Sequence, residues 1–66
     1  MERELSLLKR TIARIRREIR IRMREVQTLV EADLDCTGAA RILVHMNKDL
    51  RLYLEKLERL TAREQA

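Results

Sequence analysis

The sequence has no proline, tryptophan or phenylalanine, and only one glycine, one tyrosine and one cysteine among 66 residues. Hairpin-rich β folds need glycine, asparagine and proline in their tight turns, so this composition excludes them. One cysteine forms no internal disulfide, which excludes a disulfide-stapled secreted domain. No run of about 18 apolar residues could span a membrane, and the N-terminus lacks the basic-then-apolar order of a signal peptide. We therefore expect a small cytoplasmic protein.

Apolar residues recur at alternating steps of three and four in two long segments, a spacing typical of helices that pack along a seam. It predicts a helix over about 3–33, a turn over about 34–37 and a helix over about 38–63, in a single domain of residues 1–66. The predicted oligomer seam consists of Leu8, Ile12, Ile15, Ile19, Val26, Leu29, Leu43, Met46, Leu50, Tyr53, Leu57 and Leu60.

The break between the two segments runs from Asp33 to Gly38 and contains residues that compete with a helix for backbone hydrogen bonds. Thr37 is the best candidate for the N-cap of the second helix, and Asp35 is the next. A turn this short makes the two helices antiparallel neighbours. The predicted fold is therefore all-α, an antiparallel two-helix hairpin.

Each helix also carries large apolar residues outside the seam. A domain this small, with no disulfide and no obvious metal site, is marginally stable alone, and oligomerisation is the usual remedy. We expect a homo-oligomer, with a dimer of hairpins forming a four-helix bundle favoured over a surface dedicated to another partner. The extra apolar residues are Leu7, Ile21, Met23, Val30, Ile42, Val44, Leu52 and Leu54.

Arg22 occupies a seam position where the pattern calls for an apolar residue. A buried arginine needs a paired acid or access to water, and Glu18 and Glu25 lie within reach on the same helix. Two interpretations stay open: the stem lies along the seam with the charged group in water, or the arginine fixes the register of packing.

Basic residues concentrate in the first helix, where residues 9–24 contain eight Lys and Arg and a single acid, Glu18. The candidate polyanion-binding face consists of Arg10, Arg14, Arg17, Arg20 and Arg24. It suits phosphates, but no interleaved aromatic residue is present for base stacking, so binding to nucleic acid would have little sequence preference. An acidic protein partner and a solvated face are the alternatives. A membrane partner is unfavoured, because the apolar residues of this helix are needed for the core.

Little in the sequence suggests catalysis. Cys36 and His45 are the only soft metal ligands, and two ligands do not make a structural zinc site. Ser6 is the only serine, and a helical hairpin offers no deep pocket for a nucleophile and its base. We expect no metal, no cofactor and no enzymatic activity.

Several positions in the second half resemble a group of short uncharacterised Arg-rich helical proteins of alphaproteobacteria, especially rhizobia. The likeness spans roughly residues 12–60, and Leu34 departs from it, because that group usually has glycine there. The resemblance implies a helical hairpin and no particular activity. It rests on Glu31-Ala32-Asp33, Thr37, Ala40-Arg41, Leu43, Met46, Leu50 and Glu58-Arg59-Leu60.

Two functions are compatible with these features. The first is a structural or protein–protein interaction module, with the seam holding the oligomer together and the remaining apolar or basic residues contacting a partner. The alternative is a nucleic-acid-binding protein without sequence specificity that uses the basic face of the first helix.

Overall fold

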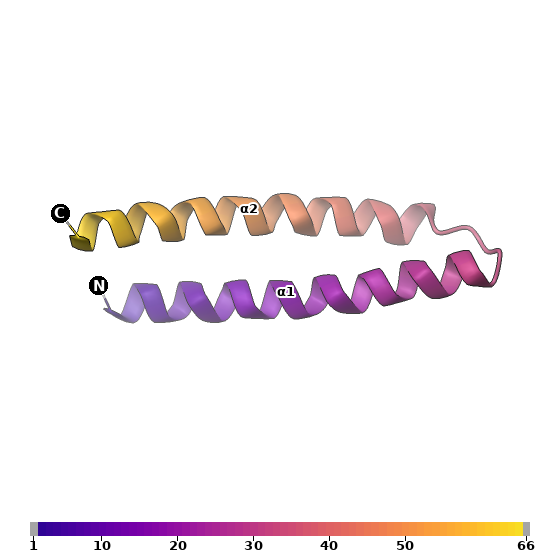
Figure 1. Ribbon diagram of the computed structural model, residues 1–66, viewed down its shortest axis with the longest axis horizontal. Helices are drawn as coiled ribbons and strands as arrows, with labels where there is room; N and C mark the ends of the chain where they lie inside the picture. Colours follow the sequence, from indigo (N-terminus) through magenta and orange to yellow (C-terminus); the bar gives the residue numbers. More distant parts are fainter. Residues whose placement is uncertain (1, 66) are drawn as a thin grey trace.

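The chain folds into two long antiparallel helices (Figure 1). The computed structural model describes the backbone of residues 2–65 and the side chains of residues 3–63. Helix α1 spans Glu2–Glu31 and helix α2 spans Thr37–Gln65, and no strand occurs within residues 2–65. The helices lie side by side along a molecule of 52 × 15 × 13 Å, with both chain ends at the same end of it. The all-α hairpin predicted from the sequence is confirmed.

The turn begins two residues earlier than the sequence pattern indicates, because α1 ends in a Schellman motif. The Leu34 N–H donates to the carbonyl of Leu29 at 2.8 Å, and the Asp33 N–H donates to the carbonyl of Val30 at 3.0 Å. Asp33 has a φ of 58°, the left-handed conformation that this motif requires at the residue after the cap. Aspartate tolerates that conformation better than most residues, so the helix ends here without a glycine.

The N-terminus of α2 is capped differently from the expectation. The Cys36 carbonyl accepts a hydrogen bond from the Ala40 N–H at 2.8 Å, so Cys36 is the N-cap residue and the assignment of Thr37 is wrong. Thr37 is the first helical residue, and both its N–H, at 3.0 Å, and its hydroxyl donate to Oδ1 of Asp35. These two bonds lower the pKa of Asp35 below its ordinary value. Asp35, the second N-cap candidate, thus supplies the side-chain oxygen that accepts hydrogen bonds at the start of α2.

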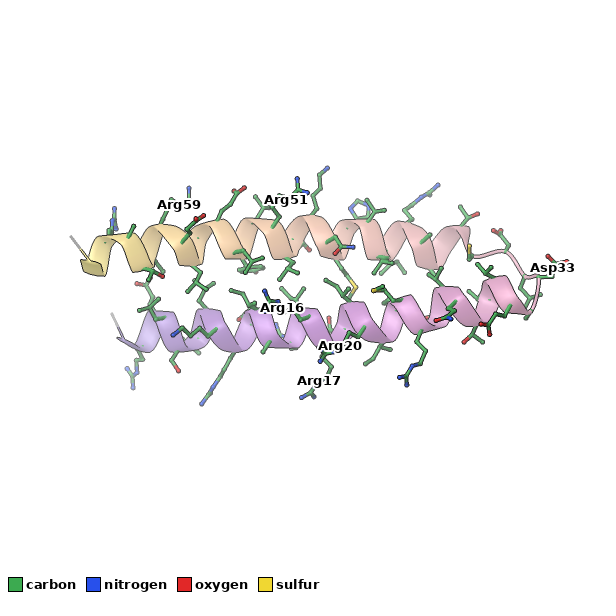
Figure 2. The ribbon with its side chains drawn as sticks, viewed as in Figure 1. Arg16, Arg17, Arg20, Asp33, Arg51 and Arg59 are labelled. Atoms are coloured by element: carbon green, nitrogen blue, oxygen red, sulfur yellow. The ribbon has the colours of Figure 1, made fainter. Side chains whose placement is uncertain are left out.

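The residues predicted as an oligomer seam pack α1 against α2 within one chain, and side chains from both helices fill the space between the ribbons (Figure 2). Leu8, Ile12 and Ile19 are the buried core, with exposed fractions of 5–8%. The other predicted seam residues are half-buried, except Tyr53, which is 37% exposed. Its neighbour Leu54 is half-buried instead, so the inward face of α2 is rotated slightly from the predicted one. The core is a single row of side chains.

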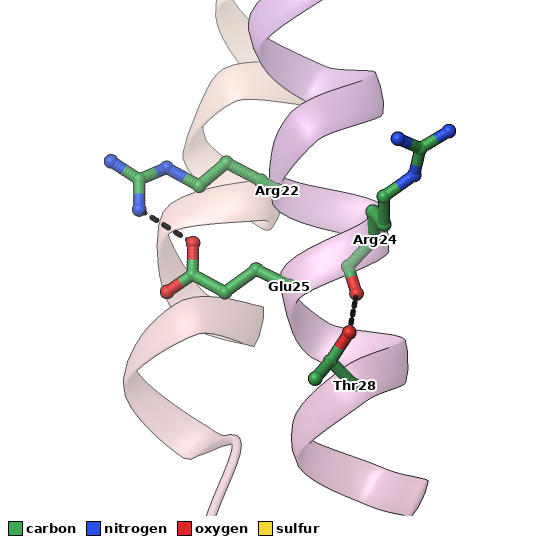
Figure 3. Close-up of polar contacts among 4 residues, drawn as sticks. All are labelled: Arg22, Arg24, Glu25 and Thr28. Atoms are coloured by element: carbon green, nitrogen blue, oxygen red, sulfur yellow. Dashed lines mark hydrogen bonds and ion pairs between the residues drawn. The ribbon is translucent and has the colours of Figure 1, made fainter.

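Arg22 interrupts this row and forms an ion pair with Glu25 (Figure 3). Nη1 of Arg22 donates to Oε2 of Glu25 at 2.9 Å, one of the two acids that the sequence offers. The side chains are 39% and 44% exposed, respectively. A pair this exposed to water contributes at most about 1 kcal/mol to stability. Arg22 therefore keeps its charge in water and leaves a gap in the apolar row.

Replacing Asp33 with glycine is expected to stabilise the hairpin by about 1 kcal/mol, because glycine adopts a positive φ without steric cost. It also removes a negative charge from the C-terminal end of α1, where the helix dipole disfavours it. Asp33→Ala, which keeps the steric cost, should be less stable than Asp33→Gly. Urea unfolding followed by circular dichroism measures both, and a glycine variant less stable than the native chain would contradict the Schellman assignment.

Arg22→Leu is expected to raise the free energy of unfolding by about 1 kcal/mol, because leucine continues the apolar row and the lost ion pair is weak. Glu25→Gln serves as the control and should change stability by less than about 0.5 kcal/mol. Thermal and urea unfolding measure both variants. A less stable Arg22→Leu protein would show that the arginine contributes more to packing than its exposure implies.

Candidate interaction surfaces

Among the side chains of residues 3–63, nine large apolar ones are exposed, with exposed fractions from 37% to 64%. Of the eight extra apolar residues in the sequence, only Leu54 is half-buried. The others form no part of the core between α1 and α2. The exposed residues are Leu7, Ile21, Met23, Val30, Leu34, Ile42, Val44, Leu52 and Tyr53.

Helical geometry assigns most of these residues to two sides of the hairpin. Each residue advances a helix by about 100°, so the residue before a seam position and the residue after it lie on opposite sides. Because α1 and α2 are antiparallel, residues that precede the seam on either helix share one side of the hairpin. We call this side the Leu7 flank, and its exposed apolar residues that precede a seam position are Leu7, Ile21, Ile42 and Leu52. Tyr53 belongs to the same flank, because its neighbour Leu54 is half-buried in its place and Tyr53 lines the depression described below. The opposite side is the Met23 flank, with Met23, Val30 and Val44.

The Leu7 flank is hollowed near the open end of the hairpin. A depression of about 200 Å³ lies where the two helices meet. Its lining consists of Glu4, Leu7 and Thr11 of α1 and Tyr53 and Lys56 of α2, together with Leu8 and Leu60 of the seam. The hydroxyl of Thr11 donates to the carbonyl of Leu7 at 3.0 Å, so it is already satisfied within its own helix. The depression is therefore a recess between the helices that combines four apolar side chains with the charged side chains of Glu4 and Lys56.

The candidate basic face lies on the outer side of α1 and is exposed throughout. Arg10, Arg17 and Arg24 are seven residues apart, which puts them in one line with a spacing of about 10 Å along the helix. Arg14 lies to one side of this line and Arg20 to the other. Figure 2 shows Arg17 pointing away from α2. We call Arg10, Arg14, Arg17, Arg20 and Arg24 the basic row.

The basic row has no acidic partner in the part of the chain whose side chains are described. The ion pair found there joins Arg22 to Glu25, and Arg22 is outside the row. Arg17, Arg20 and Arg24 border an open depression of about 550 Å³. Thr28, at its edge, donates its hydroxyl to the carbonyl of Arg24 at 2.9 Å (Figure 3). The arginine side chains are thus the charged donors that this surface presents to a ligand.

Groups suited to metal binding or catalysis are scattered. Cys36 is a free, half-buried thiol beside the turn, and His45 is exposed on α2. Within the described residues, no three His, Cys, Asp or Glu side chains come close enough to hold a metal ion. The same residues include no buried polar or charged side chain. The surfaces that remain are the two apolar flanks and the basic row.

Neither described helix is both long and apolar enough to cross a membrane. Comparison with protein-family models, with curated proteins and with solved structures found no match for the chain.

Sequence reasoning identified the extra apolar residues and the basic row, but it did not sort the apolar residues onto two flanks. The sequence carried the signal for every one of them except Tyr53, because Leu7, Ile21, Ile42 and Leu52 each precede a predicted seam position and the members of the Met23 flank each follow one. The sequence pattern also placed Tyr53 in the seam and Leu54 beside it. In the structure, Tyr53 instead lines the depression on the Leu7 flank. Two consecutive apolar residues at the edge of a seam can each be the buried one, so the spacing alone does not predict whether Tyr53 or Leu54 faces the other helix.

Proposed function

We propose that the chain is a structural or protein–protein interaction module that assembles with copies of itself, most simply as a dimer. The observation that supports this is the amount of apolar surface that the hairpin leaves uncovered. Among residues 3–63, nine large apolar side chains are exposed and only three are buried. Monomeric proteins seldom keep apolar residues in such proportion outside the core.

The total accessible surface area of the hairpin also supports self-assembly. The hairpin exposes 5816 Å². A compact monomer of this mass is expected to expose about 4,400 Å², so the chain keeps about 1,400 Å² more than it would as a compact domain. Obligate homodimers bury 2,000 Å² or more in total, which is about 1,000 Å² from each chain. The surplus surface is therefore sufficient for a stable dimer.

A four-helix bundle is the arrangement that we propose for this dimer. Two hairpins packed side by side would give each helix a second neighbour, which explains an apolar face wider than one seam. The cytoplasm is the compartment that we propose, because the one cysteine is a free thiol.

Sedimentation equilibrium at micromolar concentration is expected to give twice the chain mass of 7.9 kDa, with high helical content under the same conditions. The expected mass follows from the uncovered apolar surface. A helical species that sediments as a 7.9 kDa monomer up to about 100 µM would contradict the proposal, because a dissociation constant above that range is too weak for a structural dimer.

Nucleic-acid binding through the basic row is a second candidate function. The observation that favours it is the alignment of Arg10, Arg17 and Arg24 on a face that carries no acid pairing with them among the described side chains. Arginine binds phosphate bidentately, and neutralised phosphates release counterions. Phosphate contacts alone give no sequence preference. An acidic protein could use the same arginines.

Fluorescence anisotropy with labelled duplex DNA, duplex RNA and single strands tests this second function. If five phosphates are contacted on duplex DNA, log K should fall with log salt at a slope of about −4.5. The triple variant Arg10→Glu, Arg17→Glu, Arg24→Glu should abolish binding.

The control triple variant is Arg41→Glu, Lys48→Glu, Arg51→Glu, which makes the same change in net charge on exposed positions of α2. It should retain most of the affinity. Equal losses in both triple variants would show a general effect of net charge, and no binding at about 50 mM salt would exclude this function and leave an acidic protein as the candidate ligand.

A further inference from the structure

We infer that a second copy of this chain docks on the Leu7 flank, across Ile21, Leu52 and the recess beside Tyr53. The inference rests on the proposed self-assembly and adds to it the surface that assembles. It follows from three properties of the hairpin: the area that a dimer requires, the distribution of apolar residues along each flank, and the charges beside them.

A stable dimer needs nearly the whole length of one flank. The 15 Å width of the hairpin is that of its Cα trace, and side chains widen the pair of helices to about 20 Å. Over the 52 Å length of the hairpin, a flank therefore offers about 1,000 Å². This area equals the contribution of each chain to the smallest obligate homodimers. A contact limited to the turn or to the open end would supply only a fraction of it.

Only the Leu7 flank presents apolar residues along most of that length. Leu7 lies in the second turn of α1 near the open end, and Ile42 lies in the second turn of α2 near the connecting turn. Ile21, Leu52 and Tyr53 lie between these two levels. The apolar residues are 37–61% exposed, and the recess of about 200 Å³ between Leu7 and Tyr53 can receive a side chain from another copy. This flank has the extent that a dimer requires.

The Met23 flank does not have this extent. Met23, Val30 and Val44 all lie in the half of the hairpin near the connecting turn. The half near the open end presents charged residues on that side instead. They are Lys9, Arg16, Arg51 and Glu58, and Arg20 follows on the same flank just past the midpoint of α1.

Charge also favours the Leu7 flank. Two copies that meet through their Met23 flanks bring together surfaces on which four of five charged residues are basic, and like charges in contact cost several kcal/mol. The Leu7 flank carries both signs in similar number, so two copies can place opposite charges together. Arg14 is the one member of the basic row on this flank, and Arg10, Arg17 and Arg24 stay outside the interface. The charged residues of the Leu7 flank are Glu4, Arg14, Glu18, Glu25, Asp49, Lys56 and Arg59.

Two matched double variants test the assignment by sedimentation velocity and circular dichroism. The first is Ile21→Glu with Leu52→Glu on the Leu7 flank, where the native side chains are 59% and 61% exposed. The control is Met23→Glu with Val44→Glu on the Met23 flank, where they are 55% and 64% exposed. The two pairs introduce the same charge, one on each helix, at positions of nearly equal exposure.

The dissociation constant of the first variant should rise by at least about 100-fold, while that of the control should change by less than about 5-fold. Loss of helical content at low concentration in the first variant alone supports the same assignment, because an obligate dimer has no stable folded monomer. A first variant that remains as dimeric as the native chain overturns the inference, as does a control that loses the dimer equally or more.

Failure of the flank assignment can be distinguished from failure of the proposed self-assembly. A native chain that sediments as a folded monomer would reject self-assembly itself, whichever flank carries the substitutions. If the glutamate variants precipitate, the serine pairs Ile21→Ser with Leu52→Ser and Met23→Ser with Val44→Ser test the same contrast without added charge. The same ranking of dissociation constants is expected, and a reversed ranking would assign the contact to the Met23 flank.

Discussion

The packing of one apolar row between two helices is the interaction on which the rest of this structure depends. A two-helix hairpin leaves each helix in contact with water on every side but one. Among residues 3–63, only Leu8, Ile12 and Ile19 of the apolar residues become buried under that constraint, although nearly half of the sequence is hydrophobic. The remaining apolar surface lies on the flanks, and its burial requires another molecule. This uncovered apolar surface is the basis of the proposed dimer.

The polar features of the hairpin define where the helices end. The Schellman motif at Asp33 satisfies the last carbonyls of α1, and Asp35 accepts two hydrogen bonds from Thr37 at the start of α2. A connection of five residues then holds the helices antiparallel. This arrangement puts the residues that precede the seam on both helices onto one flank. The turn therefore determines which apolar residues of the two helices can form a common surface.

The spacing of apolar residues was sufficient to predict the hairpin, because steps of three and four specify a helical face whatever the surroundings. The same pattern located the gap at Arg22 and gave Glu25 as one of two partners. It did not predict the end of α1, because an aspartate in the left-handed conformation leaves no distinctive pattern in the sequence. The exchange of Tyr53 and Leu54 depends on how the two helices rotate against each other, which is a tertiary property. The spacing of the arginines likewise does not predict a ligand for the basic row.

The dependence of thermal stability on protein concentration tests the central claim most directly, because it asks whether folding and association are one event. For an obligate dimer, a 100-fold increase in concentration adds about 2.7 kcal/mol to stability, which raises the midpoint of unfolding by about 10 °C for two chains of this size. We expect a rise of this order between about 5 µM and about 500 µM chain. An unfolding midpoint that stays constant over that range would show that the hairpin is stable alone and would contradict the account.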